Sequence, residues 1–345
     1  MSKESNRRYW EQRALSRERQ AMASAEEFIT LLESFYRDAQ EAIAKNIENF
    51  YIRYMGKYGV SYAEAVKRLT PSERATWLLE IKRRLDEIER GIDVAENYAA
   101  LDAGSYGARI TRLQARSIEI DAEIAKLTQR FDRGLKGALG SIAQDAFLQT
   151  THEIQTRTHT GFVFRQLDTR TIENLLSYPW SGANFSQRIW RNANALRFSL
   201  RETLTNGIIR GEGIDKMMSN LNAHFDVARS AARRIVRTET NYVLNQSRLQ
   251  SFAEMGVEKY QFLATLDDRT SETCIDLDLN EYLVSEAKVG ENYPPMHPNC
   301  RSVTIPVIEG ASPSERTAKD KNGKTYYVPG DMPYKEWERK YVLAA

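Results

Sequence analysis

The first part of the chain spaces its apolar residues as an amphipathic helix does. Apolar side chains recur every three, four or seven positions in two long series with charged residues between them. The series are Phe28, Leu32, Phe35, Ala39, Ile43, Ile47, Phe50 and Tyr54, then Leu113, Ile120, Ile124, Leu127 and Phe131. Because this spacing puts the side chains on one helix face, the pattern predicts long helices that pack through these faces.

The helical pattern continues until a clear break in the middle of the chain. A capping-box sequence at Thr70 predicts a further helix over about 70–91. Pro179 and Gly182 then interrupt the pattern within four residues. Beyond this break, helices are predicted over about 185–205, closed by Gly207, over 214–221, and over 227–255, stopped by Gly256. Such short connections are typical of a small helical bundle.

The periodicity changes from helix-like to strand-like after Gly256. Apolar residues alternate with other residues around Tyr260–Leu266 and again at Val303–Val307, which predicts two strands. The polar, proline-bearing segment Asp267–Arg301 between them is predicted to be a loop. A strand or extended stretch over 324–329 and a terminal helix over about 334–341 complete the pattern.

These elements predict a predominantly α-helical α+β protein. We expect three regions: an extended helical N-terminal region (1–178), a helical bundle (179–256), and a small mixed module with a Cys/His loop and a terminal helix (257–345). The length of 345 residues allows two or three compact units.

Composition excludes several classes of protein. The chain has 41% apolar residues, 2 cysteines and a net charge of +2, which excludes wholesale disorder and a disulfide scaffold. It has no apolar run of membrane-spanning length, and its N-terminus lacks the apolar core of a secretory signal, so we expect folding in a cytoplasm and no membrane insertion. Because the net charge is small, any attraction to nucleic acid must be local.

The candidate chemistry lies in the predicted loop. Cys274, His297 and Cys300 bring together both cysteines and one of the four histidines. A thiolate, an imidazole and a second thiolate are ligands that Zn²⁺ selects, with the fourth ligand from a nearby aspartate or water. The same residues also allow a Cys274–Cys300 disulfide, or two buried thiols that pack as small apolar groups.

Acidic residues in the same loop offer an alternative. Together with His297, they could hold Mg²⁺ and activate water, as in a metal-dependent nuclease. The residues are Asp267, Asp268, Glu272, Asp276 and Asp278. No histidine follows Arg301, however, and aspartates favour such turns for local hydrogen-bonding reasons. We therefore expect no enzyme, with a nuclease or another DNA-processing enzyme as the alternative.

Positive charge concentrates in the bundle. Residues 191–250 contain ten Lys/Arg against five Asp/Glu. All five arginines from Arg229 to Arg248 fall on the last predicted helix, and Arg229, Arg233, Arg234 and Arg237 are the candidates for phosphate contacts. The alternative is a solvated or protein-facing surface. Glu239 lies among these arginines, and we expect it to pair with one of them.

Four sequence blocks resemble the phage minor head, or head morphogenesis, proteins, which include the Mu F-like minor capsid proteins. The blocks occur in the expected order, and the front and closing segments resemble members from tailed phages of Gram-positive hosts. They are Arg237-Thr238-Glu239-Thr-Asn, Tyr260 to Leu266 followed by Asp267-Asp268-Arg269-Thr270, Cys274-Ile-Asp-Leu-Asp, and Pro294-Pro295-Met-His297-Pro-Asn-Cys300-Arg301.

One departure from the family pattern concerns the cysteines. Many relatives have an additional cysteine on each side, where this chain has Ser271 and Ser302. The resemblance therefore implies that a four-thiolate metal site is absent here. A weaker zinc site or a single disulfide would still join the two halves of the loop and limit the unfolded ensemble.

The resemblance implies a minor structural component of a tailed-phage head. The expected role of this late protein is to bind portal, major capsid or scaffold subunits during head morphogenesis, or during DNA delivery and ejection. Double-stranded DNA is a further candidate partner. The expected location is the virion, in the head interior or near the portal, after assembly in the host cytoplasm. Some relatives carry ADP-ribosyltransferase domains after this module, and we expect none in the roughly forty residues that follow it here.

Overall fold

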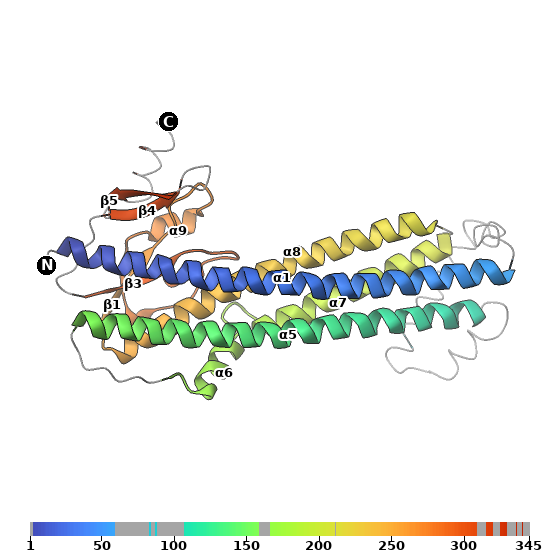
Figure 1. Ribbon diagram of the computed structural model, residues 1–345, viewed down its shortest axis with the longest axis horizontal. Helices are drawn as coiled ribbons and strands as arrows, with labels where there is room; N and C mark the ends of the chain where they lie inside the picture. The colour runs from blue at the N-terminus through green and yellow to red at the C-terminus, as the bar shows by residue number, and fades with distance from the viewer. Residues whose placement is uncertain are drawn as a thin grey trace. The chain divides into compact units, whose positions relative to one another are not determined.

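The computed structural model describes residues 3–58, 83, 87, 107–158, 166–210, 212–308, 315–319, 325–329, 336 and 340. Long helices dominate these residues, and the strands are short (Figure 1). The prediction of a predominantly helical α+β protein is confirmed. The predicted helices over 70–91 and 334–341 fall almost entirely outside the described residues.

The two long N-terminal helices follow the predicted apolar faces. α1 spans Lys3–Tyr58 and α5 spans Gly107–Thr158. Every member of the two apolar series whose side chain is described is buried, from Phe28 to Ile47 and from Ile120 to Phe131. These faces need partners, because helix stability in proteins comes mainly from packing of the apolar side.

The break in the middle of the chain is confirmed, and it separates α6 (Thr169–Ser177) from α7 (Phe185–Arg210). Asp168 caps α6 by accepting a hydrogen bond from the backbone N–H of Thr171 at 2.8 Å. The predicted end of α7 at Gly207 is wrong, since the helix continues to Arg210. Gly207 instead permits a close approach, because a Cβ there would lie 2.6 Å from Cε of Met217.

The two predicted helices over 214–221 and 227–255 are one continuous helix, α8, which spans Ile214–Glu254. Leu221, Phe225 and Ala228 are all buried, so the helical spacing of apolar residues runs through the predicted gap. The predicted stop is confirmed at Gly256, which has φ +69°. The backbone N–H of Val257 bonds the carbonyl of Phe252 at 2.9 Å and closes the last turn.

The strands that follow α8 form a three-stranded antiparallel sheet. β1 (Lys259–Leu263) lies between β2 (Glu281–Leu283) and β3 (Val303–Val307), with Gln261 opposite Ile305 and Glu281. β4 (Glu315–Lys319) and β5 (Thr325–Pro329) form a separate antiparallel pair.

The segment Asp267–Arg301 is more ordered than the predicted loop. It contains the helix α9 (Glu272–Leu277), strand β2 and the 3₁₀ turn η1 (Val284–Glu286). These elements have three to six residues each, which is too short for a periodic pattern to be visible in the sequence.

Contacts group the chain into two compact units whose limits fall inside the long helices. The first comprises Met1–Leu31, Asp132–Arg188 and Ala232–Ala345, and the second comprises Leu32–Phe131 and Ile189–Ala231. The predicted division at 178 and 256 followed breaks in sequence pattern, whereas α1, α5 and α8 each contribute residues to both units. The three predicted regions stay a prediction.

The first unit has a continuous core beneath its sheet. Buried side chains from α1, α5, α8, the sheet and the loop before β3 meet there: Trp10, Ala14, Ile154, Phe252, Val257, Tyr260, Leu263, Tyr293, Val303 and Ile305. The ring of Tyr293 meets that of Tyr260 edge to face, with centroids 4.9 Å apart. Among the described residues, the structure contains no helix apolar and long enough to cross a bilayer.

Candidate functional site

The sequence blocks singled out above come together in the first compact unit. α8 carries the first block, β1 and the following turn carry the second, α9 carries the third, and the loop before β3 carries the fourth. We call this assembly of the four blocks the clasp. Three sets of contacts determine its geometry.

The first set of contacts ties α8 to the loop that bears His297 and Cys300. Thr238 Oγ1 accepts a hydrogen bond from the backbone N–H of Asn299 at 2.9 Å. The side-chain amides of Asn241 and Asn245 donate to the carbonyl of Ser302 at 3.1 and 3.3 Å. Because Thr238, these two asparagines and Ser302 are buried, the bonds replace water that these polar groups would otherwise need.

The second set of contacts ties the turn after β1 to the same loop. Arg301 donates two hydrogen bonds to the Asp267 carboxylate, one of them 2.7 Å long. Thr265 Oγ1 donates to the carbonyl of Arg301 at 3.1 Å, and the backbone N–H of Arg269 donates to Asp267 at 3.0 Å. Burial by itself would raise the pKa of Asp267, but the bonds and charge of Arg301 outweigh it and hold that pKa below its usual range.

The remaining polar residues of the turn differ in their exposure. Thr270 Oγ1 bonds the carbonyl of Thr265 and also reaches Asp267 at 3.2 Å. Asp268 and the side chain of Arg269 are exposed. Thus Asp267 and Thr270 hold the turn together, while Asp268 and Arg269 face solvent.

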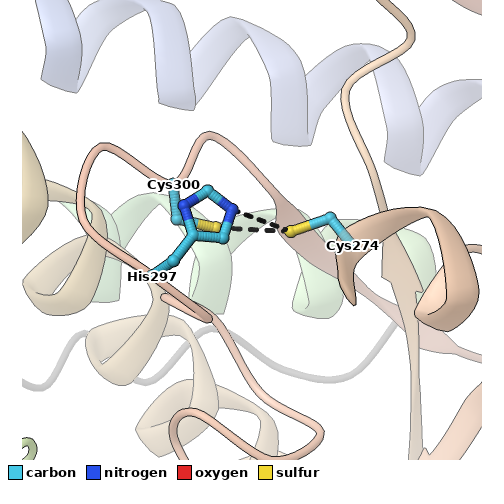
Figure 2. A group of neighbouring side chains, drawn as sticks. All are labelled: Cys274, His297 and Cys300. Atoms are coloured by element: carbon cyan, nitrogen blue, oxygen red, sulfur yellow. Dashed lines mark hydrogen bonds between the residues drawn. The ribbon is translucent and has the colours of Figure 1, made fainter. Parts of the chain in front are cut away.

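The third set of contacts joins Cys274, His297 and Cys300 (Figure 2). Their ligand atoms all lie within 4.8 Å of one another. Cys274 Sγ is 3.3 Å from His297 Nε2 and 3.8 Å from Cys300 Sγ. Cys274 comes from α9, whose N-terminus is capped by Ser271, and the other two residues come from the loop after the Pro294–Pro295 cis peptide bond. The structure therefore places the three predicted ligands together.

The protonation of this cluster follows from its hydrogen bonds. His297 Nδ1 lies 2.9 Å from the carbonyl of Pro298, so the proton resides on Nδ1 and the Nε2 lone pair faces Cys274. The hydrogen bond between the two sulfurs, with burial, raises the pKa of Cys274. The same bond, aided by the backbone N–H groups of Met296 and Ser302, lowers the pKa of Cys300.

The acidic residues of the loop do not join this cluster. Among the described residues, the group with metal-ligand geometry consists of Cys274, His297 and Cys300 alone. Asp267 bonds Arg301, and Asp278 accepts a hydrogen bond from the backbone N–H of Ala264 at 2.9 Å. These aspartates hold backbone and side chains in place, as expected for residues in turns.

Glu239 pairs with an arginine, but the partner is Arg188 at the start of α7 and not one of the arginines of the positive stretch among which it was predicted to pair. Its buried carboxylate accepts hydrogen bonds from Arg188 and, at 3.1 Å, from Nε1 of Trp180. Burial raises the pKa of Glu239 more than these two partners lower it. Trp180 also stacks on Tyr242 with centroids 5.3 Å apart, so the turn between α6 and α7 is fastened to α8.

The candidate arginines have different environments. Arg229 bonds Asp226 at 2.9 Å, and Arg237 bonds Glu26 at 2.7 Å. Arg233 and Arg234 are exposed. Arg248, counted with the positive helix in the sequence, is buried instead. Its spacing of four residues from the buried Leu244 and Phe252 could have revealed this.

Sequence reasoning missed two buried polar groups that support the clasp. Tyr293 donates a hydrogen bond from its hydroxyl to the carbonyl of Asn245 at 2.7 Å. Asn245 follows Asn241 by one helical turn within the buried stretch of α8. Two asparagines at this spacing between apolar residues are the signal that could have identified a polar contact on that face.

Comparison with known proteins agrees with the motif blocks. Residues 199–305, which include the whole clasp, match the family described as Phage Mu protein F like protein. The minor head protein GP7 of Bacillus phage SPP1 is 28% identical over 282 residues, covering 74% of this chain and 89% of GP7.

A second relative is longer than this chain. The NAD(+)–arginine ADP-ribosyltransferase EFV of Enterococcus faecalis is 24% identical over 289 residues, covering 79% of this chain. The chain spans 58% of the length of that relative. No solved structure matches the chain. The resemblance to the phage minor head proteins is confirmed, and residues 199–305 form a Phage Mu protein F-like region.

Proposed function

We propose that this protein is a minor structural component of a tailed-phage head and acts in head morphogenesis. The observation that carries the proposal is the agreement between the clasp and the family region. All of the blocks that fold into the clasp lie within residues 199–305. GP7, a minor head protein by name, is similar over 89% of its own length.

The mechanism we propose is binding to other head components, such as the portal, major capsid or scaffold protein. The acidic residues Asp267 and Asp278 are engaged in structural hydrogen bonds, and the described residues contain no cluster of carboxylates with metal-ligand geometry. The long helices present extended surfaces suited to such contacts. The location that follows from this role is the virion, in the head interior or near the portal.

Deletion of the gene from its phage tests the role. We expect the deletion to leave fewer infectious particles and the full chain, supplied in trans, to restore them. The restored particles should contain the protein at low copy, as seen by mass spectrometry of purified heads. Absence of the protein from heads, together with undiminished infectivity of the deletion phage, would contradict the proposal.

The similarity to EFV prompts a direct test for an enzyme. The activity that its name states belongs to a protein of which this chain spans 58%, and we propose no such activity for this chain. Purified chain incubated with NAD⁺ and an arginine-containing acceptor should release no nicotinamide. It should also leave double-stranded DNA intact in the presence of Mg²⁺. Turnover in either assay, lost on substitution within the chain, would overturn the structural role.

A contact with packaged DNA is a second proposed property, independent of the head role. Arg233 and Arg234 are exposed on α8, and each phosphate neutralised by such a side chain releases counterions. Two further candidates, Arg229 and Arg237, bond Asp226 and Glu26. We assign the contact to Arg233 and Arg234 because both side chains are exposed on the same helix.

A further inference from the structure

Two of the distances within the Cys274, His297 and Cys300 cluster match those of a tetrahedral metal centre, and all three ligand atoms lie within 4.8 Å of one another. Zinc–sulfur bonds of about 2.3 Å and a zinc–nitrogen bond of about 2.0 Å place two sulfurs about 3.8 Å apart and a sulfur and nitrogen about 3.5 Å apart. The observed separations are 3.8 Å between the sulfurs and 3.3 Å from Cys274 Sγ to His297 Nε2. Sulfurs in a disulfide would be about 2.05 Å apart.

The orientation of the groups also favours a metal over two packed thiols. Apolar packing would explain two sulfurs in contact, whereas an imidazole nitrogen directed at Cys274 Sγ adds a third group of the kind that binds zinc. The His297 ring is oriented by its Nδ1–H bond to the carbonyl of Pro298, which directs Nε2 toward Cys274 Sγ. Metal-bound histidines use their second nitrogen in this way.

Backbone donors complete the surroundings of the second sulfur. The N–H groups of Met296 and Ser302 donate to Cys300 Sγ, and such bonds stabilise a metal-bound thiolate. The backbone N–H of Cys300 in turn bonds the carbonyl of His297 at 3.1 Å, which fixes the short turn between the two residues. The loop is thus shaped to present both ligand atoms on one side (Figure 2).

We propose that Cys274, His297 and Cys300 bind one zinc ion, with a solvent molecule as its fourth ligand. No further thiol, imidazole or carboxylate among the described residues joins the three ligand atoms. The hydroxyls of Ser271 and Ser302 instead lie against Cys274 Sγ, where they can hold a water molecule. This site goes beyond the proposed head role and depends on no partner.

The proposed ion would join α9 to the loop before β3. Its two sulfur ligands, Cys274 and Cys300, are 26 residues apart in the chain. The ion would therefore close the segment between them, which the hydrogen bonds between the turn after β1 and Arg301 hold only in part. Binding energy of a metal that requires the folded site becomes folding energy. Zinc should therefore raise the thermal stability of the module, and a chelator should lower it.

Metal content of the full chain tests the assignment of the ligands. Protein purified under reducing conditions with Zn²⁺ present, then dialysed, should retain one zinc per chain. His297→Gln and Cys300→Ser should lose it, and Co²⁺ substituted into the wild-type chain should give the intense visible bands of a tetrahedral site. His152→Gln serves as the matched control, because His152 is exposed and lies outside the cluster.

Three results would overturn the assignment. The first is a reduced, folded chain that retains no zinc. The second is equal retention of zinc by the wild type and both cluster variants. The third is a native mass that is lower by two hydrogens, which reveals a disulfide. Far-ultraviolet circular dichroism of His297→Gln shows whether it is folded. Because His297 is partly exposed, this substitution should leave the helices intact.

A second pair of variants tests the solvent ligand. Ser302→Cys places a third thiol beside Cys274, and Ser302→Ala removes the hydroxyl without adding a ligand. With a solvent-filled fourth position, Ser302→Cys should slow zinc release to a chelator and strengthen the sulfur-to-Co²⁺ charge-transfer band, whereas Ser302→Ala should do neither. A Ser302→Cys chain that behaves as the wild type would overturn the solvent ligand.

Discussion

Arg301 binds Asp267 through two parallel hydrogen bonds across 34 residues of the chain, and this pair fastens the turn after β1 to the loop before β3. The Asp267 side chain is only 5% exposed, whereas that of Arg301 is 26% exposed. The carboxylate therefore depends on the guanidinium for most of its neutralisation. Arg301 directly follows Cys300 in the chain. The Arg301–Asp267 pair therefore also helps to position the Cys/His cluster.

Removal of the arginine should destabilise the module. Arg301→Ala leaves the buried Asp267 charge without its principal partner, and we expect a loss of about 3 kcal/mol in the free energy of unfolding. Urea denaturation followed by circular dichroism measures this loss. Asp268→Asn is the matched control, since Asp268 is exposed, and it should change stability by less than about 0.5 kcal/mol. Equal effects of the two substitutions would contradict the importance of the pair.

The same pair predicts a dependence of stability on pH. The pKa of Asp267 is lowered in the folded chain, so the folded state binds the proton more weakly than the unfolded state. The stabilisation is thus fully present above the unfolded pKa of about 3.9 and is lost as the pH falls through the folded pKa. The difference in unfolding midpoint between wild type and Asp267→Asn should therefore shrink on acidification. A difference that stays constant down to strongly acidic pH would rule out this linkage.

Arg188 should matter more than its exposed neighbour on α7. Arg188→Ala removes a partner of the buried Glu239, and we expect a loss of about 3 kcal/mol. Arg191→Ala removes the same charge from an exposed position and should cost little. The two variants are compared by thermal unfolding. If Arg191→Ala were as costly as Arg188→Ala, net charge rather than the buried pair would explain the loss.

The exposed arginines of α8 predict a salt-sensitive retention of DNA. The double variant Arg233→Ala/Arg234→Ala should weaken retention on immobilised double-stranded DNA and reduce its dependence on salt, because fewer phosphates are neutralised. Lys126→Ala/Lys136→Ala removes the same charge from exposed positions on α5 and should retain wild-type binding. Equal weakening by both double variants would show that general charge, not this part of α8, governs retention.

Local pattern was sufficient for much of the fold. The spacing from Phe28 to Ile47 identified the buried face of α1, and Pro179 and Gly182 marked the turn before α7. The continuity of α8 was not visible, because the polar residues near His224 resembled a connection. His224 instead lies 2.9 Å from Thr203 Oγ1 on α7, and that contact is between residues far apart in sequence.

Residue types and order in the sequence determined which groups could act together: the helical faces, the strand pattern, and Cys274, His297 and Cys300 as one set. Only the tertiary structure decided that Thr238 meets Asn299, that Glu239 pairs with Arg188, and that Arg248 is buried. The physical reason is that periodicity reports which side of a helix faces inward, whereas partners across the core are chosen by packing and by the need of buried polar groups for hydrogen bonds.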